Sequence, residues 1–322
     1  MIKNIFLSIA ALCCAMASSA AQYNDLKTIQ SGGVERQYFI YVPDNLKPNS
    51  PMFISCHGMD QDYQYQKTQM RWMPLAADTA SFVVVFPVGV AGTAWGRPYT
   101  TGWNIDNMTD VNFMLDIIDE VKTDYNIDDT RVYMSGFSLG GVFAYYMAQK
   151  VPDRIAAVVS FSGYDLTGAS ISCSRPIPIF HLHGTSDDVM NYSGVESYLK
   201  KWYDLFHCPS QPVVINNLHE CSHLQGSATL TTYGTCDCEV EVKLLTIPGI
   251  GHDWTDVFAC RNDIVVGEII TFCKQYNTGC EKIHVGLDDV TVDTKTTKRL
   301  EDGQLLIDRD DKTYNAQGTQ VK

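Results

Sequence analysis

The five residues from Gly136 to Gly140 read Gly-Phe-Ser-Leu-Gly, a pattern in which a serine can act as a nucleophile. The apolar residues 131–135 before this motif favour a β-strand, and residues 141–150 after it are rich in helix formers and end at a proline. On such a strand–turn–helix unit the Ser138 hydroxyl projects from the edge of a sheet, and the helix N-terminus favours developing negative charge. The motif therefore predicts nucleophilic catalysis at Ser138.

A serine nucleophile needs a base and an orienting acid, which follow it in the chain order Ser, Asp, His when the turn is of this kind. Residues 176–183 are predicted to form a buried strand, and Asp187 and Asp188 follow it directly. Residues 240–247 alternate as a strand does and run into a glycine-rich loop that presents His252. We expect His252 as the base and Asp187 as the acid, with Asp188 as the alternative acid.

An oxyanion hole in this type of site uses the backbone N–H of the residue after the nucleophile, which is Leu139 here, and a second N–H that follows the third strand. Residues 52–56 form an apolar segment followed by His57 and Gly58, so Met59 is the expected second donor. The alternative interpretation of His57 and Gly58 is an ordinary turn at the end of a strand.

The rest of the chain supplies the elements that must hold these residues in place. A mature chain near 300 residues is long enough for one large domain. Strand patterns alternate with helical ones, which predicts an α/β fold with a mostly parallel central sheet and helices on both faces. Predicted strands cover residues 34–42, 51–56, 81–87, 131–135, 155–161, 176–183 and 240–247, and predicted helices cover 111–121, 141–150, 193–206 and 263–276.

With these motifs the chain resembles the secreted α/β-hydrolase esterases of carbohydrate esterase family one, which include feruloyl esterases, acetyl xylan esterases and polyhydroxybutyrate depolymerases. The resemblance implies Ser138 as nucleophile, His252 as general base and acid, Asp187 as orienting carboxylate, and no cofactor or metal. The family's histidine loop usually continues with Trp-Pro-Gly, whereas Trp254 is followed here by Thr-Asp. The matching pieces lie at 56–61, 103–104, 110–111, 136–141, 183–187 and 251–254, within roughly residues 25–280.

The resemblance implies an ester of plant cell-wall polysaccharide as the substrate. A feruloyl ester is the favoured acyl group, and acetyl xylan and polyester are the alternatives. Four aromatic residues are candidates for stacking on a phenolic ring or a sugar, or else belong to the core: Trp95, Tyr99, Trp103 and Trp254. A peptidase or acyltransferase on the same triad is a rival, as is a non-catalytic binding protein of this fold.

The first 21 residues have the pattern of a secretory signal peptide: a positive charge at Lys3, an apolar stretch over 5–17 and small residues at 18–21. The flanks of Cys13 and Cys14 fit a lipoprotein signal poorly. We therefore expect a secreted protein, either extracellular or in the periplasm or on the surface of a Gram-negative bacterium, with an esterase domain over 22–280.

Residues 281–322 differ in character from the domain before them. Residues 288–293 and 303–308 are short β-prone segments with polar flanks. Their order resembles the C-terminal sorting tails of secreted Bacteroidetes proteins, which implies a secretion signal. The alternatives are a small β-rich appendage or an uninformative tail.

Of the 11 cysteines, two lie in the leader and nine in the mature chain, and in an oxidising compartment these predict disulfides. Because nine is odd, at least one is unpaired, and Cys56 in a core strand is the best candidate. We expect Cys208 to pair with Cys236 or Cys238. A zinc site is the alternative use of the segment that holds His219, Cys221 and His223, and His181 and His183 on one strand face could also be ligands.

The formal net charge of −13 disfavours nucleic acids and anionic membranes as partners, because their phosphates would be repelled. No stretch after the leader approaches the 18 apolar residues of a membrane-spanning helix. The sequence therefore predicts neither a nucleic-acid partner nor a membrane span.

Overall fold

The computed structural model divides the chain into two compact units, residues 1–282 and 283–322. The proposed signal peptide lies outside the residues that the structure describes, as do Trp254, the segment 219–223 and the segment 288–293. The described residues are 24–70, 73, 77, 78, 80–217, 227–253, 262–280, 283, 297–301, 304–309 and 312–315.

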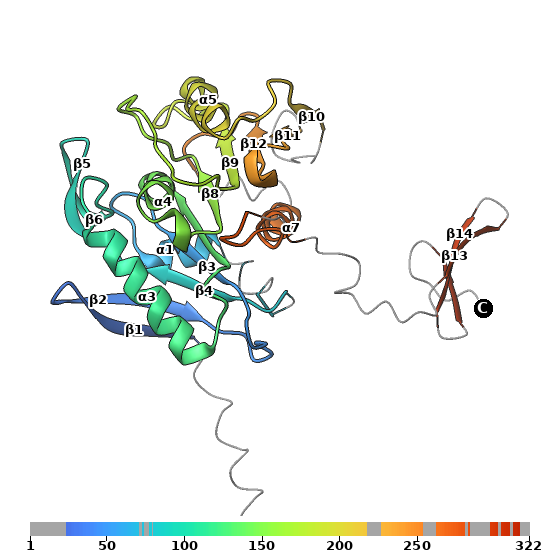
Figure 1. Cartoon of the computed structure of the whole chain (residues 1–322), viewed down its shortest axis with the longest axis horizontal. Helices are drawn as coiled ribbons and strands as arrows, with labels where there is room; N and C mark the ends of the chain where they lie inside the picture. Colours follow the sequence, from blue (N-terminus) through green and yellow to red (C-terminus); the bar gives the residue numbers. More distant parts are fainter. Residues whose placement is uncertain are drawn as a thin grey trace, which may run out of the picture. The chain divides into compact units, whose positions relative to one another are not determined.

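A ten-stranded sheet forms the centre of the larger unit, in the order β1-β2-β4-β3-β7-β8-β9-β12-β11-β10 (Figure 1). The six strands from β4 to β12 pair in parallel, and the strands at both edges pair antiparallel. The strands are β1 (Asn24–Ser31), β2 (Val34–Tyr41), β3 (Met52–Cys56), β4 (Val83–Pro87), β7 (Val132–Phe137), β8 (Ala157–Phe161), β9 (Ile179–Gly184), β10 (Val213–Ile215), β11 (Thr229–Tyr233) and β12 (Val242–Ile247).

Helices cover both faces of this sheet, and each face has its own core because successive strand side chains point to opposite sides. On β3, for example, Ile54 packs into the core with α3, α4 and α5, whereas Phe53 packs into the core with α7. α1 contacts β3 and β4. The helices are α1 (Tyr63–Gln69), α3 (Thr109–Tyr125), α4 (Leu139–Lys150), α5 (Val195–Leu205) and α7 (Asn262–Cys273).

The structure confirms the expected fold class: all seven predicted strands and all four predicted helices are present. It adds elements that the sequence did not predict, namely β1, β10, β11, α1 and a separate hairpin of β5 (Val90–Ala94) and β6 (Arg97–Gly102). β1 and β10 are edge strands, and β10 is exposed throughout. Edge strands carry a weaker hydrophobic pattern than buried ones, which explains why they were missed.

Two disulfides are present among the described residues, Cys208–Cys236 and Cys238–Cys280. The first is one of the two pairings expected for Cys208. Cys56 is free and buried in β3, as predicted, and Cys173 and Cys273 are free as well. Cys221 and Cys260 lie outside the described residues.

Removing the Cys208–Cys236 bond should lower the free energy of unfolding by about 2–4 kcal/mol, because the bond closes a loop and restricts the unfolded chain. The double variant Cys208→Ser/Cys236→Ser, compared with the wild type in urea without reductant, measures this loss. Cys173→Ser is the control and should leave the urea midpoint nearly unchanged, since Cys173 forms no disulfide. Equal midpoints for the wild type and the double variant would show that the bond does not form in the purified protein.

The smaller unit contains a three-stranded antiparallel sheet of β13 (Thr297–Glu301), β14 (Gln304–Arg309) and β15 (Lys312–Asn315). The β-prone segment predicted over 303–308 corresponds to β14. Among the described residues of both units, no helix has the length and apolar content that a bilayer crossing requires.

Candidate active site

Ser138 occupies a sharp turn between β7 and α4. Its backbone has φ of 54° and ψ of −121°, a region that non-glycine residues rarely adopt and that costs about 1–3 kcal/mol. Backbone hydrogen bonds hold the turn: Ser138 N–H donates to the Phe161 carbonyl at 2.9 Å, and Val142 N–H donates to the Ser138 carbonyl at 3.0 Å. The strained backbone is thus fixed by both the neighbouring strand and the helix that follows.

The glycines of the motif are required by close backbone approach. A Cβ atom on Gly140 would lie 2.2 Å from the Cys56 carbonyl oxygen, and one on Gly136 would lie 2.3 Å from the Gly140 carbonyl carbon. Neither contact can be relieved by moving a side chain, because both neighbours are backbone atoms. The two glycines therefore let α4 begin directly above the ends of β3 and β7.

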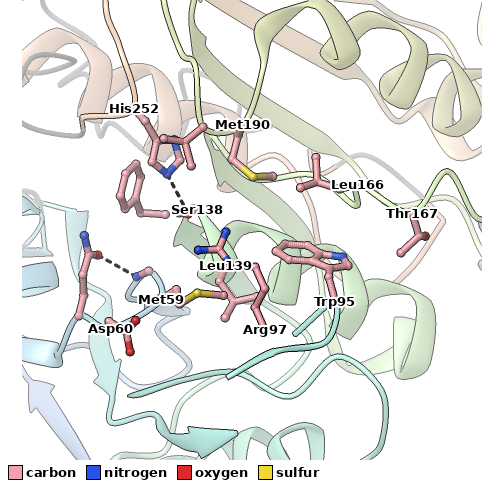
Figure 2. A pocket seen from close by; sticks show the side chains of 14 residues that line it. Met59, Asp60, Trp95, Arg97, Ser138, Leu139, Leu166, Thr167, Met190 and His252 are labelled. Carbon is pink, nitrogen blue, oxygen red and sulfur yellow. Dashed lines mark hydrogen bonds between the residues drawn. The ribbon is translucent and has the colours of Figure 1, made fainter. Parts of the chain in front are cut away.

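Ser138, His252 and Asp187 form one hydrogen-bonded chain. His252 Nε2 lies 2.9 Å from Ser138 Oγ, the contact dashed in Figure 2. His252 Nδ1 lies 2.8 Å from Asp187 Oδ2. The three residues follow β7, β9 and β12, whose carboxyl ends meet at one edge of the parallel sheet. Because a carboxylate only accepts, Nδ1 carries the proton, and Nε2 is free to accept the serine hydroxyl.

Asp187 and not Asp188 takes part in this chain. Asp187 is 3% exposed, and its Oδ1 accepts the backbone N–H groups of Val189 at 3.0 Å and Met190 at 2.8 Å. Asp188 is exposed. Burial alone would raise the pKa of the Asp187 carboxyl, but hydrogen bonds from His183 and His252 outweigh it and lower the pKa overall. Asp187 therefore stays ionised at working pH.

A cavity of about 480 Å³ opens above Ser138 and His252. Both expected oxyanion residues, Met59 and Leu139, line it beside Ser138 (Figure 2). Among the hydrogen bonds of the described residues, none uses the backbone N–H of Met59 or Leu139 as donor. The Leu139 amide opens α4, where the helix dipole adds partial positive charge. An oxyanion formed at this place would find two available donors.

His57 has a supporting role that the sequence did not reveal. Its ring is buried, with Nδ1 2.8 Å from the Gly58 carbonyl, and its Nε2 accepts the Gly89 N–H at 3.0 Å. Burial lowers the pKa of His57, which keeps the ring neutral and able to make both contacts. The residue therefore fixes the loop that carries Met59, and its position directly before Gly58 was the signal that could have shown this.

Trp95 and Tyr99 come from the β5–β6 hairpin but lie in different places. Trp95 lines the cavity, as predicted for a residue that contacts substrate. Tyr99 is 6% exposed and belongs to the core, which corrects the expectation that it contacts substrate. Its register partner across the hairpin is Gly92, and the missing side chain there leaves room for the ring.

Trp103 is also a core residue, which corrects its predicted role in binding. It is fully buried, its ring stacks on Phe143 at 5.4 Å, and its Nε1–H donates to the His57 carbonyl at 2.7 Å. Trp103 therefore stabilises the loop that carries Met59, through its hydrogen bond to the His57 carbonyl. Trp254 lies outside the described residues.

The cavity walls include residues that carried no signal in the sequence. They come from the hairpin, from the loop after β8 and from the loop that follows Asp187, segments that only the fold brings together. These residues are Val189 and, labelled in Figure 2, Arg97, Leu166, Thr167 and Met190.

No group of three or more histidine, cysteine, aspartate or glutamate side chains in the described part of the chain has the arrangement of a metal site. The possible zinc ligands His219, Cys221 and His223 lie outside that part. The arrangement at the cavity is suited to acyl transfer, because a serine hydroxyl, an imidazole and a carboxylate form one hydrogen-bonded chain there.

Residues 84–224 match the family described as phospholipase/carboxylesterase. A bifunctional acetylxylan esterase/xylanase of Neocallimastix patriciarum is 45% identical over 229 residues, which cover 71% of this chain and 32% of that protein. Feruloyl esterase B of Piromyces equi is 28% identical over 224 residues, which cover 63% of this chain and 39% of that protein. The chain thus aligns with well under half the length of these two relatives.

Two solved structures share the fold. An acetyl xylan esterase from Aspergillus awamori superposes with a TM-score of 0.55 at 16% identity, covering 71% of this chain and 94% of that one. A ferulic acid esterase of carbohydrate esterase family one from Anaeromyces mucronatus gives a TM-score of 0.50 at 16% identity, covering 76% and 90%. These two structures confirm the α/β-hydrolase fold, and the family match together with the sequence relatives confirms the resemblance that the motifs indicated: the chain is an α/β-hydrolase similar in sequence to acetylxylan and feruloyl esterases.

Proposed function

We propose that the protein is a secreted serine esterase that hydrolyses an ester of plant cell-wall xylan. The observation that carries the proposal is the hydrogen-bonded chain of Ser138, His252 and Asp187 at a cavity of about 480 Å³. The names of the sequence relatives support an ester substrate. Secretion rests on the leader pattern of residues 1–21, and residues 281–322 are proposed as a sorting segment.

In the proposed reaction, His252 Nε2 takes the proton of Ser138 as Oγ attacks the ester carbonyl. The backbone N–H groups of Met59 and Leu139 hold the negative charge of the tetrahedral intermediate. His252 then gives the proton to the sugar oxygen as the bond between this oxygen and the acyl carbon breaks, so the sugar leaves as an alcohol and an acyl-Ser138 enzyme remains. Water, deprotonated by His252, hydrolyses this ester and releases the carboxylic acid. The reaction as proposed needs no cofactor.

The acyl group is proposed to be acetyl, whereas the sequence had favoured feruloyl. Two findings support this change. Tyr99 and Trp103, which were candidates either for stacking on a phenolic ring or a sugar or for the core, are buried in the core. The relative at 45% identity is named for acetylxylan esterase activity, whereas the named feruloyl esterase is 28% identical. A feruloyl ester remains the second candidate, because Trp95, Leu166 and Val189 give the cavity apolar walls that could hold a ring.

Substrate comparison with the purified full chain tests this choice. We expect kcat/KM for acetylated xylan and p-nitrophenyl acetate to exceed that for methyl ferulate by about 10-fold or more, since misfit of a bulky acyl group costs transition-state binding. A higher kcat/KM on methyl ferulate would establish the feruloyl alternative. A folded protein that releases neither product would contradict the proposed esterase function and favour a binding protein.

A further inference from the structure

His181 and His183 are two fully buried histidines on β9 that the triad chemistry leaves unexplained. They are two positions apart on the strand and so share one face. Their rings stack with centroids 5.2 Å apart and an interplanar angle of 11°, and His181 Nε2 lies 2.9 Å from His183 Nδ1. The buried pair is therefore joined by a direct hydrogen bond between the two imidazoles.

Both outer nitrogens of this pair have partners as well. His181 Nδ1 lies 3.0 Å from the hydroxyl of Tyr145, which comes from α4. His183 Nε2 lies 2.6 Å from the Met190 carbonyl and 3.2 Å from Asp187 Oδ2. All four ring nitrogens are thus used within the protein, which corrects the alternative that the two histidines are metal ligands. The chain of contacts runs from the helix behind the nucleophile to the acid of the triad.

The direction of the hydrogen bonds follows from the end at Asp187. The Met190 carbonyl and the Asp187 carboxylate can only accept, so His183 Nε2 carries a proton. In a neutral ring Nδ1 of His183 then accepts, and His181 Nε2 must donate to it. His181 Nδ1 is left to accept the proton of the Tyr145 hydroxyl. With both imidazoles neutral, every donor points toward Asp187.

We propose that Tyr145, His181 and His183, called the imidazole chain below, are positioning residues that orient Asp187 for catalysis. The proposal rests on the function proposed above. Asp187 Oδ2 accepts the N–H of His252, and Oδ1 accepts the backbone N–H groups of Val189 and Met190. The N–H of His183 donates to the Met190 carbonyl at 2.6 Å and lies 3.2 Å from Asp187 Oδ2. These three hydrogen bonds and the His183 contact define the plane of the carboxylate, and the plane in turn sets the direction of the His252 ring.

The surroundings favour the neutral form of the chain. Burial lowers the pKa of His181 and raises that of Tyr145, so each remains uncharged near neutral pH. Three further tyrosines, from the loop after β8, the loop before α5 and α5 itself, face the chain with ring centroids at 5.0–6.0 Å. These are Tyr164 and Tyr192 against His183, and Tyr198 against Tyr145. Of the described groups in direct contact with the chain, Asp187 is the charged one.

The stability of the fold does not require that His181 and His183 occupy these buried positions on β9. Replacing hydrogen-bonded polar partners by apolar groups of similar shape is often neutral, and β9 is otherwise filled by residues such as Phe180 and Leu182. What apolar residues could not supply is a buried N–H that binds the Met190 carbonyl and lies beside Asp187 Oδ2. The hydrogen-bond chain therefore fits a role in orienting the acid.

His183→Phe and His183→Gln form the main test. Phenylalanine fills the space but removes the N–H, and glutamine keeps an amide donor at a similar reach. We expect His183→Phe to lower kcat on p-nitrophenyl acetate about 10–100-fold with KM little changed, since a displaced acid misdirects His252. His183→Gln should recover most of the loss. Equal kcat values for the wild type and His183→Phe would overturn the proposal.

The pH profile separates orientation of the acid from a general effect of packing. Without the His183 donor, Asp187 Oδ2 offers its charge to His252 alone and stabilises the imidazolium more strongly. The acid limb of kcat/KM should therefore move to higher pH in His183→Phe, by about half a unit to one unit. An unchanged limb together with a lower kcat would show that the histidine only fills the core.

Tyr145→Phe tests the far end of the chain, and Tyr146→Phe is its matched control on the same helix, since Tyr146 donates to the Asn107 carbonyl instead. We expect about a 3-fold lower kcat for Tyr145→Phe and no change for the control. In the His183→Phe background, Tyr145→Phe should cost nothing more, because the two residues act through one path. If the losses in kcat of the two single variants instead added up in the double variant, the proposed coupling through the imidazole chain would be contradicted.

Nitrogen-15 NMR of the imidazoles tests the proton arrangement without any enzymatic readout. The directions of the hydrogen bonds predict that both His181 and His183 carry their proton at Nε2 and that these protons exchange slowly. Protonation of either ring at Nδ1 would overturn the inference. A wild type that shows these tautomers but no ester hydrolysis would instead mean that the proposed function has failed.

Discussion

Ser138→Ala should lower kcat/KM for p-nitrophenyl acetate by about 10⁴-fold or more while leaving the thermal midpoint almost unchanged. The loss is large because nucleophile and base act as one unit, and removing either abolishes the acyl-enzyme route. The fold should tolerate the change because the hydroxyl hydrogen bond to His252 is at the cavity surface. His252→Ala should lose about as much, and the double variant should lose little more.

Ser135→Ala is the matched control for this prediction. Ser135 lies on the same strand, three residues before the nucleophile, and its buried hydroxyl has no hydrogen-bond partner in the described part of the chain. Activity should therefore remain at the wild-type level. If Ser138→Ala kept more than about one hundredth of wild-type kcat/KM, the nucleophile would lie elsewhere.

Asp187→Asn should lower kcat by about 10³–10⁴-fold, whereas Asp188→Asn should stay within about 2-fold of wild type. An asparagine at position 187 can turn its NH₂ group toward His252 Nδ1. His252 Nδ1 must then accept, so Nε2 carries the proton and cannot take the one from Ser138. Asp188 is exposed and outside the hydrogen-bonded chain, so it serves as the isosteric control next in sequence.

The pH dependence of kcat/KM sharpens the assignment. Since its hydrogen bonds lower the pKa of Asp187, this carboxylate stays ionised as pH falls toward the ordinary range of an aspartate. We therefore expect that kcat/KM shows no loss of activity from protonation of Asp187 in that pH range. A larger loss for Asp188→Asn than for Asp187→Asn would show that the two carboxylates exchange roles in solution.

Much of the candidate site is local and was therefore predictable. The motif from Gly136 to Gly140 sets its own turn, because its neighbours favour a strand and a helix and its glycines permit close contact. The acid and the histidine each follow a strand of strong hydrophobic pattern. In a parallel sheet such strands end at the same edge, so the order of motifs along the chain is enough to place Ser138, Asp187 and His252 together.

Which aromatic side chains line the cavity and which are buried in the core depends on contacts between segments distant in sequence. Trp95 and Tyr99 share one hairpin, yet Trp95 lines the cavity whereas Tyr99 packs in the core, where the missing side chain of Gly92 across the hairpin leaves space for its ring. Trp103 is drawn inward by the carbonyl of His57 and the ring of Phe143. The presence of an aromatic residue in the sequence does not tell whether it contacts substrate or packs in the core, since an aromatic ring is equally suited to both places.

The sequence by itself determined the α/β class, and it predicted Ser138 as nucleophile, His252 as base and one of two neighbouring aspartates as acid, because each depends on a short motif or on a strand's hydrophobic period. Only the tertiary structure decided that Asp187 is the acid that meets His252, that Cys208 pairs with Cys236, and that His181 and His183 lead from Tyr145 to the acid. The physical reason is that hydrogen bonds and disulfides depend on distances of a few ångströms between atoms. Those distances are set by how the strands and loops pack, which no local pattern records.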